Sequence, residues 1–327
     1  MLSRKERIAW KKAFVKVEKI LSKKKYECLY DGCSETAIKS HSQQKNGPLR
    51  AICENGKVYR LNDDLQNSYS VESDEIKNDF VLKGIGESSV FPGFCHEHEK
   101  IFSVFEDTDL VVGNKNQACS LFYRTFSYEK ARKRREYERW SLLLDELYDV
   151  IGNSRKGRQQ IDAFKKHIEV TCNYNISRAH EMLQQDDFNE LNVIWYKFES
   201  NLNVSCSSTI NLQLDDYIPY VLQNPSSPVP TFTFNIIPSV TCTHIIISWL
   251  LEFDEFAKWL IDVSEDKNVM EILINRFCFC DSEDACINPS LWDSVLNKPL
   301  FIHNMSHVVQ RGHLSISDVP SLIKLKK

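Results

Sequence analysis

The sequence predicts an α+β protein with an N-terminal zinc-binding module, a helical middle and a C-terminal α+β region. Three observations support this fold class. Cysteine and histidine pairs stand near the start, long stretches with helical spacing fill the middle, and segments rich in Thr, Ile, Phe and Val follow residue 200. A chain of 327 residues has room for about two to three domains of about 100–150 residues. We therefore divide it into a basic amphipathic helix (1–25), a zinc-binding module (26–112), a helical region with a basic run (113–200) and an α+β domain (201–327).

Composition and charge narrow the classes of function. Apolar residues make up 42% and charged residues 26% of the chain, as in soluble globular proteins. The formal net charge is -4, so contact with nucleic acid would have to come from a local basic patch. The longest apolar run, Ile245–Leu251, is too short to cross a bilayer, and the charged N-terminal stretch lacks the apolar core of an export signal. We expect no transmembrane segment and a cytoplasmic location.

The first 25 residues read as one amphipathic helix with an apolar face and a basic face. Apolar residues recur at helical spacing at Trp10, Phe14, Val17 and Leu21. A second face carries Lys12, Lys16, Lys19 and Lys23. Two interpretations stay open: a solvated helix that packs one face on the body of the protein, or a helix that contacts phosphates or a membrane surface.

Two pairs of soft metal ligands point to a zinc site in residues 26–112. Cys28 and Cys33 form a short knuckle, and Cys95 and His98 follow a Pro-Gly turn. Zinc prefers four such ligands in a tetrahedron, and residues at i and i+3 of a helical turn lie on the same side. We therefore predict that all four bind one zinc ion, with His96 turned away from it. Glu97 and Glu99 are candidates to accept the N–H of the ligating imidazole.

The rest of this segment reads as short elements separated by turns. Ile52–Leu61 contains an Asn-Gly pair between apolar arms and predicts a hairpin, and Phe80–Gly84 predicts a strand. The polar stretch Asn62–Lys77 predicts a loop. A helix is expected from Cys95 to about Asp107.

The order of knuckle, hairpin and ligand-bearing helix resembles a treble-clef zinc finger, and His41 extends the resemblance to the zinc-containing HNH, or ββα-metal, nucleases. That resemblance implies that His41 is the general base of a nuclease that also needs Mg²⁺ or Mn²⁺. The sequence departs from the nuclease pattern at Ser40, where an acidic residue is usual, and at Glu99, where Asn or His is usual. Three alternatives stay open: a binding-only relative of the same finger, His41 as a zinc ligand in place of His98, or His41 in a local packing role.

Residues 113–200 read as helices. A long uninterrupted helix is expected up to Gly152, a second over Gln159–Gln185 and a third over Phe188–Phe198. The first contains a basic run of Arg132, Lys133, Arg134 and Arg135, which is either a solvated face or a phosphate-binding surface.

The last region mixes strands and helices. Strands are expected over 204–214, 230–238 and 240–251, and helices over 254–263 and 268–279. The Pro/Ser-rich stretch Gln223–Pro230 reads as a loop or linker. Three clustered cysteines, Cys278, Cys280 and Cys286, fit buried positions better than a metal site, because a clear fourth ligand is lacking.

These features favour a zinc-stabilised nucleic-acid-binding protein. The basic features lie in the first 140 residues and the acidic patches in the last 80, so one half would face phosphates and the other a protein partner. The alternatives are an HNH-like nuclease that uses His41, and a protein-interaction protein in which zinc is purely structural. The general character of the chain is similar to that of proteins from bacterial mobile-element or phage-defence loci.

Overall fold

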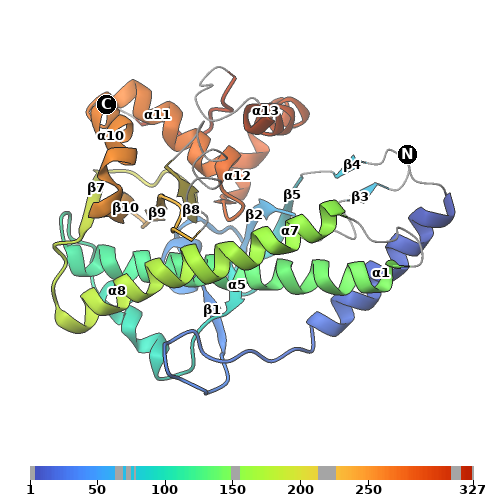
Figure 1. The fold of residues 1–327 in the computed structure, drawn as a ribbon. Helices are drawn as coiled ribbons and strands as arrows, with labels where there is room; N and C mark the ends of the chain where they lie inside the picture. Colours follow the sequence, from blue (N-terminus) through green and yellow to red (C-terminus); the bar gives the residue numbers. More distant parts are fainter. Residues whose placement is uncertain are drawn as a thin grey trace.

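The computed structural model describes residues 4–62, 69–70, 75–76, 79–148, 155–212, 226–310 and 318–325. Helices and strands together make an α+β protein, as the sequence predicts (Figure 1). The expected loop Asn62–Lys77 lies mostly outside the described residues. Within it the structure describes two short paired strands, β3 (Tyr69–Ser70) and β4 (Glu75–Ile76).

One long helix, α5 (Lys115–Glu146), organises the helical part. The side chain of Asn114 caps it by accepting a hydrogen bond from the backbone N–H of Gln117. α1 (Arg4–Leu21) packs on its C-terminal end, and a run of three helical segments packs along its length (Figure 1). These segments are α7 (Arg155–Lys166), the π-helical turn η3 (His167–Cys172) and α8 (Asn173–Gln185). The predictions of a long helix and of a second one ending at Gln185 are confirmed.

The amphipathic face predicted for the first helix is confirmed. Val17 and Leu21 are buried against Leu143 and Leu147 of the α5 end, and Trp10 and Phe14 pack on the same cluster. Burial of this face leaves the lysine face of α1 outward, which matters for the function proposed below.

A seven-stranded antiparallel sheet has the strand order β5-β2-β11-β8-β9-β10-β7. Its strands are β2 (Lys57–Leu61), β5 (Phe80–Gly84), β7 (Leu191–Phe198), β8 (Val204–Asn211), β9 (Thr231–Pro238), β10 (Thr243–Leu250) and β11 (Cys286–Ile287). The short strand β11 pairs with β2 on one side and with β8 on the other. Strands from residues 26–112 and from residues 201–327 therefore share one sheet.

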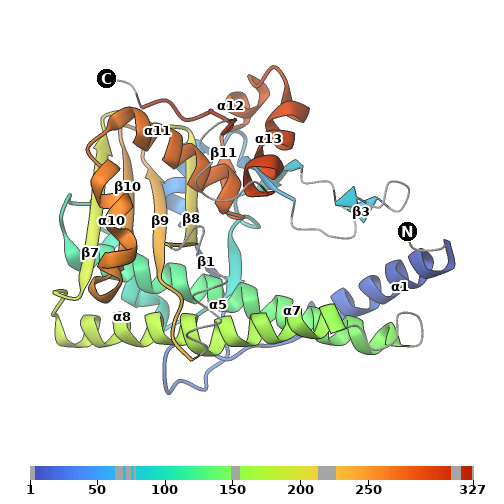
Figure 2. The ribbon, with the colours of Figure 1, turned by 45° about the horizontal axis from the view of Figure 1, so that its top comes forward.

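Helices pack on both faces of this sheet. Alternate residues of a strand point to opposite faces of the sheet, and β9 has partners on both faces. On one face, Phe232 and Phe234 contact the ring of Phe277. Asn235 accepts a hydrogen bond from Thr125 of α5 on the other. The C-terminal elements are η4 (Leu251–Phe253), α10 (Asp254–Val263), α11 (Lys267–Arg276), η5 (Phe277–Asp281), α12 (Pro289–Asp293) and α13 (Lys298–Gln310) (Figure 2). The three strands and two helices predicted for this region are confirmed.

One predicted element is wrong, and a second is confirmed only at its turn. The third helix expected over Phe188–Phe198 is strand β7, which pairs with β10 along its whole length. Its β-branched and aromatic residues gain more from this pairing than from a local helix. The hairpin expected over Ile52–Leu61 is reduced to a tight turn, closed by a bridge between Glu54 and Lys57. Its first arm is the helical turn α2 (Arg50–Ile52), and β2 pairs with β5 and β11 instead.

Candidate metal centre

The two ligand pairs meet because a backbone contact joins their turns. The N–H of Leu29, beside the first knuckle cysteine, donates to the carbonyl of Gly93, just before Cys95. Gly93 also lets this turn lie close to Ser40, because a Cβ there would lie 2.6 Å from Ser40 Oγ, which real side chains avoid. Gly32 takes a positive φ of 74° and lets the knuckle curl back.

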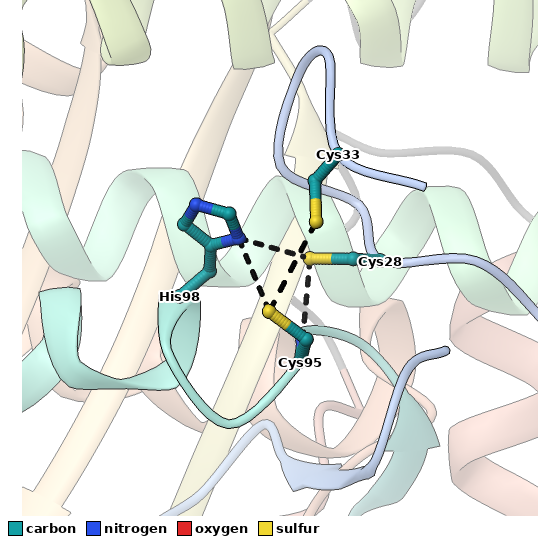
Figure 3. Close-up of side chains that lie close together, drawn as sticks. All are labelled: Cys28, Cys33, Cys95 and His98. Carbon is teal, nitrogen blue, oxygen red and sulfur yellow. Dashed lines mark hydrogen bonds between the residues drawn. The ribbon is translucent and has the colours of Figure 1, made fainter. Parts of the chain in front are cut away.

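Cys28, Cys33, Cys95 and His98 form one cluster, with ligand atoms all within 4.8 Å of one another (Figure 3). The Nδ1 atom of His98 lies 3.2 Å from Cys95 Sγ and 3.5 Å from Cys28 Sγ, and Cys33 Sγ lies 4.0 Å from Cys95 Sγ. A tetrahedral zinc with Zn–S bonds of about 2.3 Å and a Zn–N bond of about 2.0–2.1 Å sets its ligand atoms roughly 3.5–3.8 Å apart. The donor set and its spacing therefore fit zinc.

The environment of the cluster prepares thiols and imidazole for metal binding in different ways. Burial raises the pKa of Cys28 to about 11, so a cation is needed to hold it as a thiolate. The backbone N–H of His98 lowers the pKa of Cys95. The ring of Tyr30 stacks on that of His98 at 3.8 Å between centroids and 4° between planes, which fixes the imidazole orientation. Four protein ligands complete a tetrahedron and leave no position for substrate, as in structural zinc sites.

The residues flanking His98 have other partners. Glu97 pairs with Lys100 at the surface. Glu99 accepts a 2.6 Å hydrogen bond from Ser40 and forms an ion pair with Arg124. The sequence predicts that Glu97 or Glu99 accepts the N–H of the His98 imidazole. The contacts of both carboxylates are with other residues instead. His96 is exposed and stands outside the cluster.

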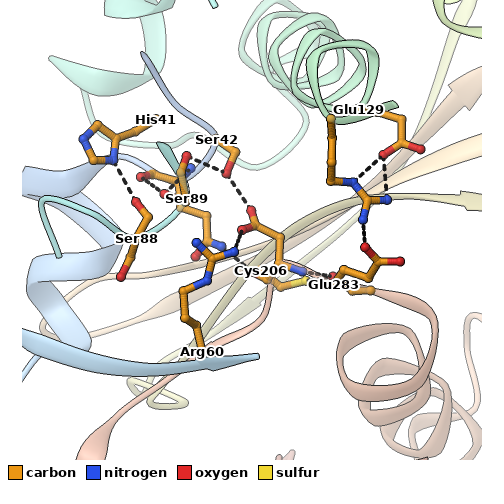
Figure 4. Close-up of polar contacts among 12 residues, drawn as sticks. His41, Ser42, Arg60, Ser88, Ser89, Glu129, Cys206 and Glu283 are labelled. Atoms are coloured by element: carbon orange, nitrogen blue, oxygen red, sulfur yellow. Dashed lines mark hydrogen bonds and ion pairs between the residues drawn. The ribbon is translucent and has the colours of Figure 1, made fainter. Parts of the chain in front are cut away.

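His41 ends strand β1 (Lys39–His41), which pairs with β6 (Val90–Pro92) immediately before Cys95. It does not belong to the cluster of possible metal ligands found in the described residues. Its Nδ1 lies 3.1 Å from the carbonyl oxygen of Ser88 (Figure 4). A carbonyl can only accept, so Nδ1 carries the proton and Nε2 is the acceptor. Burial lowers the pKa of His41, and the charges of Arg124 and Lys45 lower it further.

The two basic candidates differ in what surrounds them. Lys12, Lys16 and Lys19 of α1, and Lys23 just after its end, are all exposed. The run on α5 is occupied by neighbours: Arg132 and Lys133 pair with Glu129, and Arg135 pairs with Glu18. The guanidinium of Arg134 lies 4.3 Å from the ring centroid of Tyr26. The basic groups of this run are therefore engaged within the protein, and Arg135 joins α5 to α1.

The three clustered cysteines of the C-terminal region form no metal group within the described ranges. Cys278 and Cys286 are fully buried, and Cys280 is partly so. Burial raises the pKa of Cys280 to about 12, which keeps it a neutral thiol. The interpretation of these residues as buried positions is consistent with that environment.

A buried polar network escaped the sequence analysis. Ser42 donates to Asp284 at 2.6 Å, and the side-chain amide of Gln43 donates to the carbonyl of the same residue (Figure 4). Arg60 lies 3.9 Å from the other carboxylate oxygen of Asp284. The polar stretch around Ser42 carried no local signal, because its partner stands 242 residues away. The network joins the segment after His41 to Asp284, which precedes β11, and to Arg60 of β2.

Comparison of the chain with models of known protein families, with curated proteins and with solved structures found no match. None of the helices in the described ranges is both long enough and apolar enough to span a bilayer.

Proposed function

We propose that the chain is a zinc-stabilised nucleic-acid-binding protein whose contact surface is the lysine face of α1. The zinc module would be treble-clef-like, with Cys28, Cys33, Cys95 and His98 holding a structural ion. One observation carries the proposal: the apolar face of α1 is buried on α5, while Lys12, Lys16, Lys19 and Lys23 all remain exposed.

The geometry of these lysines suits a phosphate backbone. Lys12, Lys16 and Lys19 span about 10 Å of α1 at a rise of about 1.5 Å per residue, and Lys23 follows two residues after the end of the helix. Lys16 forms an exposed ion pair with Glu146, which a phosphate can replace at little cost. Contacts between lysine ammonium groups and phosphates carry no information on the bases. We therefore expect binding that does not depend on the nucleotide sequence.

Replacing Lys12, Lys16, Lys19 and Lys23 with glutamine should weaken binding to a mixed-sequence duplex and flatten its salt dependence. Each phosphate contact contributes about -0.9 to the slope of log K against log salt, so losing four should change the slope by about 3.6. Fluorescence anisotropy across a salt series measures both quantities.

The matched control replaces four exposed lysines on other elements, namely Lys57, Lys165, Lys258 and Lys267, with glutamine. It changes the net charge equally and should leave the slope nearly unchanged. Equal losses in the two variants would show that only overall charge matters, and the absence of binding at low salt would remove the proposal.

A metal-dependent nuclease is the second candidate, because the bond from His41 Nδ1 to Ser88 leaves Nε2 free to accept a proton, as a general base requires. The neighbouring carboxylates argue against it. Arg124 pairs with both Glu99 and Glu106, so its guanidinium occupies the place that a divalent cation would need. We therefore favour the binding-only form of the finger.

We expect no cleavage by the wild type in Mg²⁺ or Mn²⁺, and we expect His41→Ala to bind nucleic acid with unchanged affinity. The assay incubates labelled duplex and single strands with each ion and both proteins. Cleavage that requires a divalent ion and disappears in His41→Ala, at unchanged zinc content, would establish the nuclease instead.

A further inference from the structure

A small cavity with both polar and apolar walls lies between the seven-stranded sheet, α5 and the segment that follows His41. Its volume is about 30 Å³, and its wall includes Gln43, Arg124, Ser207 and Asn235. One water needs roughly 10–15 Å³ of such space, so the cavity has room for about two waters.

Three side chains of the wall carry buried polar atoms without a hydrogen-bond partner in the part of the chain that the structure describes. They are Oε1 of Gln43, Nε and Nη1 of Arg124, and Nδ2 of Asn235. All three residues are at least 97% buried. An unsatisfied buried polar group costs about 1–3 kcal/mol, so a concentration of them in one cavity points to a ligand.

The neighbours of these side chains fix which atoms remain available. The amide nitrogen of Gln43 donates to Asp284, which leaves its oxygen. The amide oxygen of Asn235 accepts from Thr125, which leaves its nitrogen. Glu106 and Glu99 bond only Nη2 of Arg124, which leaves Nε and Nη1. The wall therefore offers several donors and one acceptor.

Two features of the backbone add to the case. Ser89, which holds the backbone of Ser42 and Gln43, has a positive φ of 57°, a strained conformation for a residue with a side chain. The wall also includes Gln44 and Pro48, at the start of and within the kinked turn η1 (Lys45–Leu49), where Gly47 departs from helical geometry. Strained residues concentrate at functional sites.

We propose that this cavity binds a small tetrahedral oxyanion of the phosphate class, with Arg124 and Asn235 donating to its oxygens and Gln43 accepting from its P–OH group. A hydrogen phosphate group supplies both acceptors and a donor. Glu99 and Glu106 together compensate the single charge of Arg124, so recognition rests on hydrogen bonds and not on charge. The site is separate from the lysine face of α1.

The test titrates the full-length protein with inorganic phosphate and with a 5′-mononucleotide by calorimetry. We expect saturable binding of at least one of them in the wild type. Asn235→Asp should weaken it at least about tenfold, because the change keeps the shape and the acceptor to Thr125 but turns a donor into a repelling carboxylate. The variant with glutamine at the four lysines on and just after α1 should bind as the wild type does.

Two further arms make the result decisive. Asn175→Asp is the matched control, because Asn175 is equally buried but does not line the cavity. Tighter binding of the mononucleotide would show that the ligand of the cavity is the phosphate group of a larger molecule. Binding of inorganic phosphate alone would show that the ligand is the free ion. The absence of saturable binding to the wild type, or equal binding to Asn235→Asp, would overturn the proposal whether or not the variant is stable.

Discussion

Replacing Cys95 with serine is expected to abolish stoichiometric zinc binding and to lower the free energy of unfolding by more than about 3 kcal/mol. The ion would join two segments that are 62 residues apart, at Cys33 and Cys95. Without it, the three remaining ligands would hold buried sulfur and imidazole atoms against one another with no cation between them. Metal content by atomic emission and unfolding in urea measure the two effects.

The control for this prediction is Cys53→Ser. Cys53 is a cysteine of intermediate exposure outside the cluster, so it tests the loss of a thiol without the loss of a ligand. We expect full zinc content and a change of less than about 1 kcal/mol. Retention of zinc by Cys95→Ser, or an equal loss of zinc by Cys53→Ser, would contradict the assignment of the ligands.

Replacing Glu129 with glutamine is expected to cost about 3–5 kcal/mol at neutral pH. This carboxylate is 7% exposed and pairs with Arg132, Lys133 and His167. Burial alone would raise its pKa, but Arg132 and Lys133 outweigh burial and hold the pKa well below the usual 4.5. The variant keeps the volume and leaves these basic groups without their shared counterion.

The pH dependence of this effect follows from the direction of the shift. Because the folded-state pKa is lowered, the stability from Glu129 is fully present above about pH 4.5 and is lost as pH falls toward the folded-state value. The difference between wild type and Glu129→Gln should therefore shrink in acid. Glu255→Gln, at an exposed position, should show a change within about 0.5 kcal/mol at every pH. A difference that is independent of pH would contradict the account.

The sequence was most informative where local spacing decides the structure. The apolar row of α1 and the uninterrupted length of α5 could both be predicted from helical periodicity. The cluster of possible metal ligands could be predicted because zinc demands few residue types and each pair stands on its own turn. Nothing beyond residue chemistry and spacing was needed there.

Prediction failed where distant partners decide. β7 has a helical spacing of apolar residues, yet β10 lies beside it and supplies a full set of strand hydrogen bonds. The partners of Arg132, Lys133 and Arg135 come partly from other elements. The sequence alone therefore does not reveal that these basic groups form ion pairs within the protein. The contact of Ser42 with Asp284 and the cavity beside it depend on tertiary placement alone.

The central claim is that Cys28, Cys33, Cys95 and His98 hold a closed, structural zinc ion. X-ray absorption at the zinc edge of the purified protein tests it most directly. We expect one zinc per chain, three sulfur neighbours at about 2.3 Å and one imidazole nitrogen at about 2.0–2.1 Å, with no exchangeable oxygen ligand. Absence of zinc, fewer than three sulfur neighbours, or a bound water in the first coordination sphere would contradict the account.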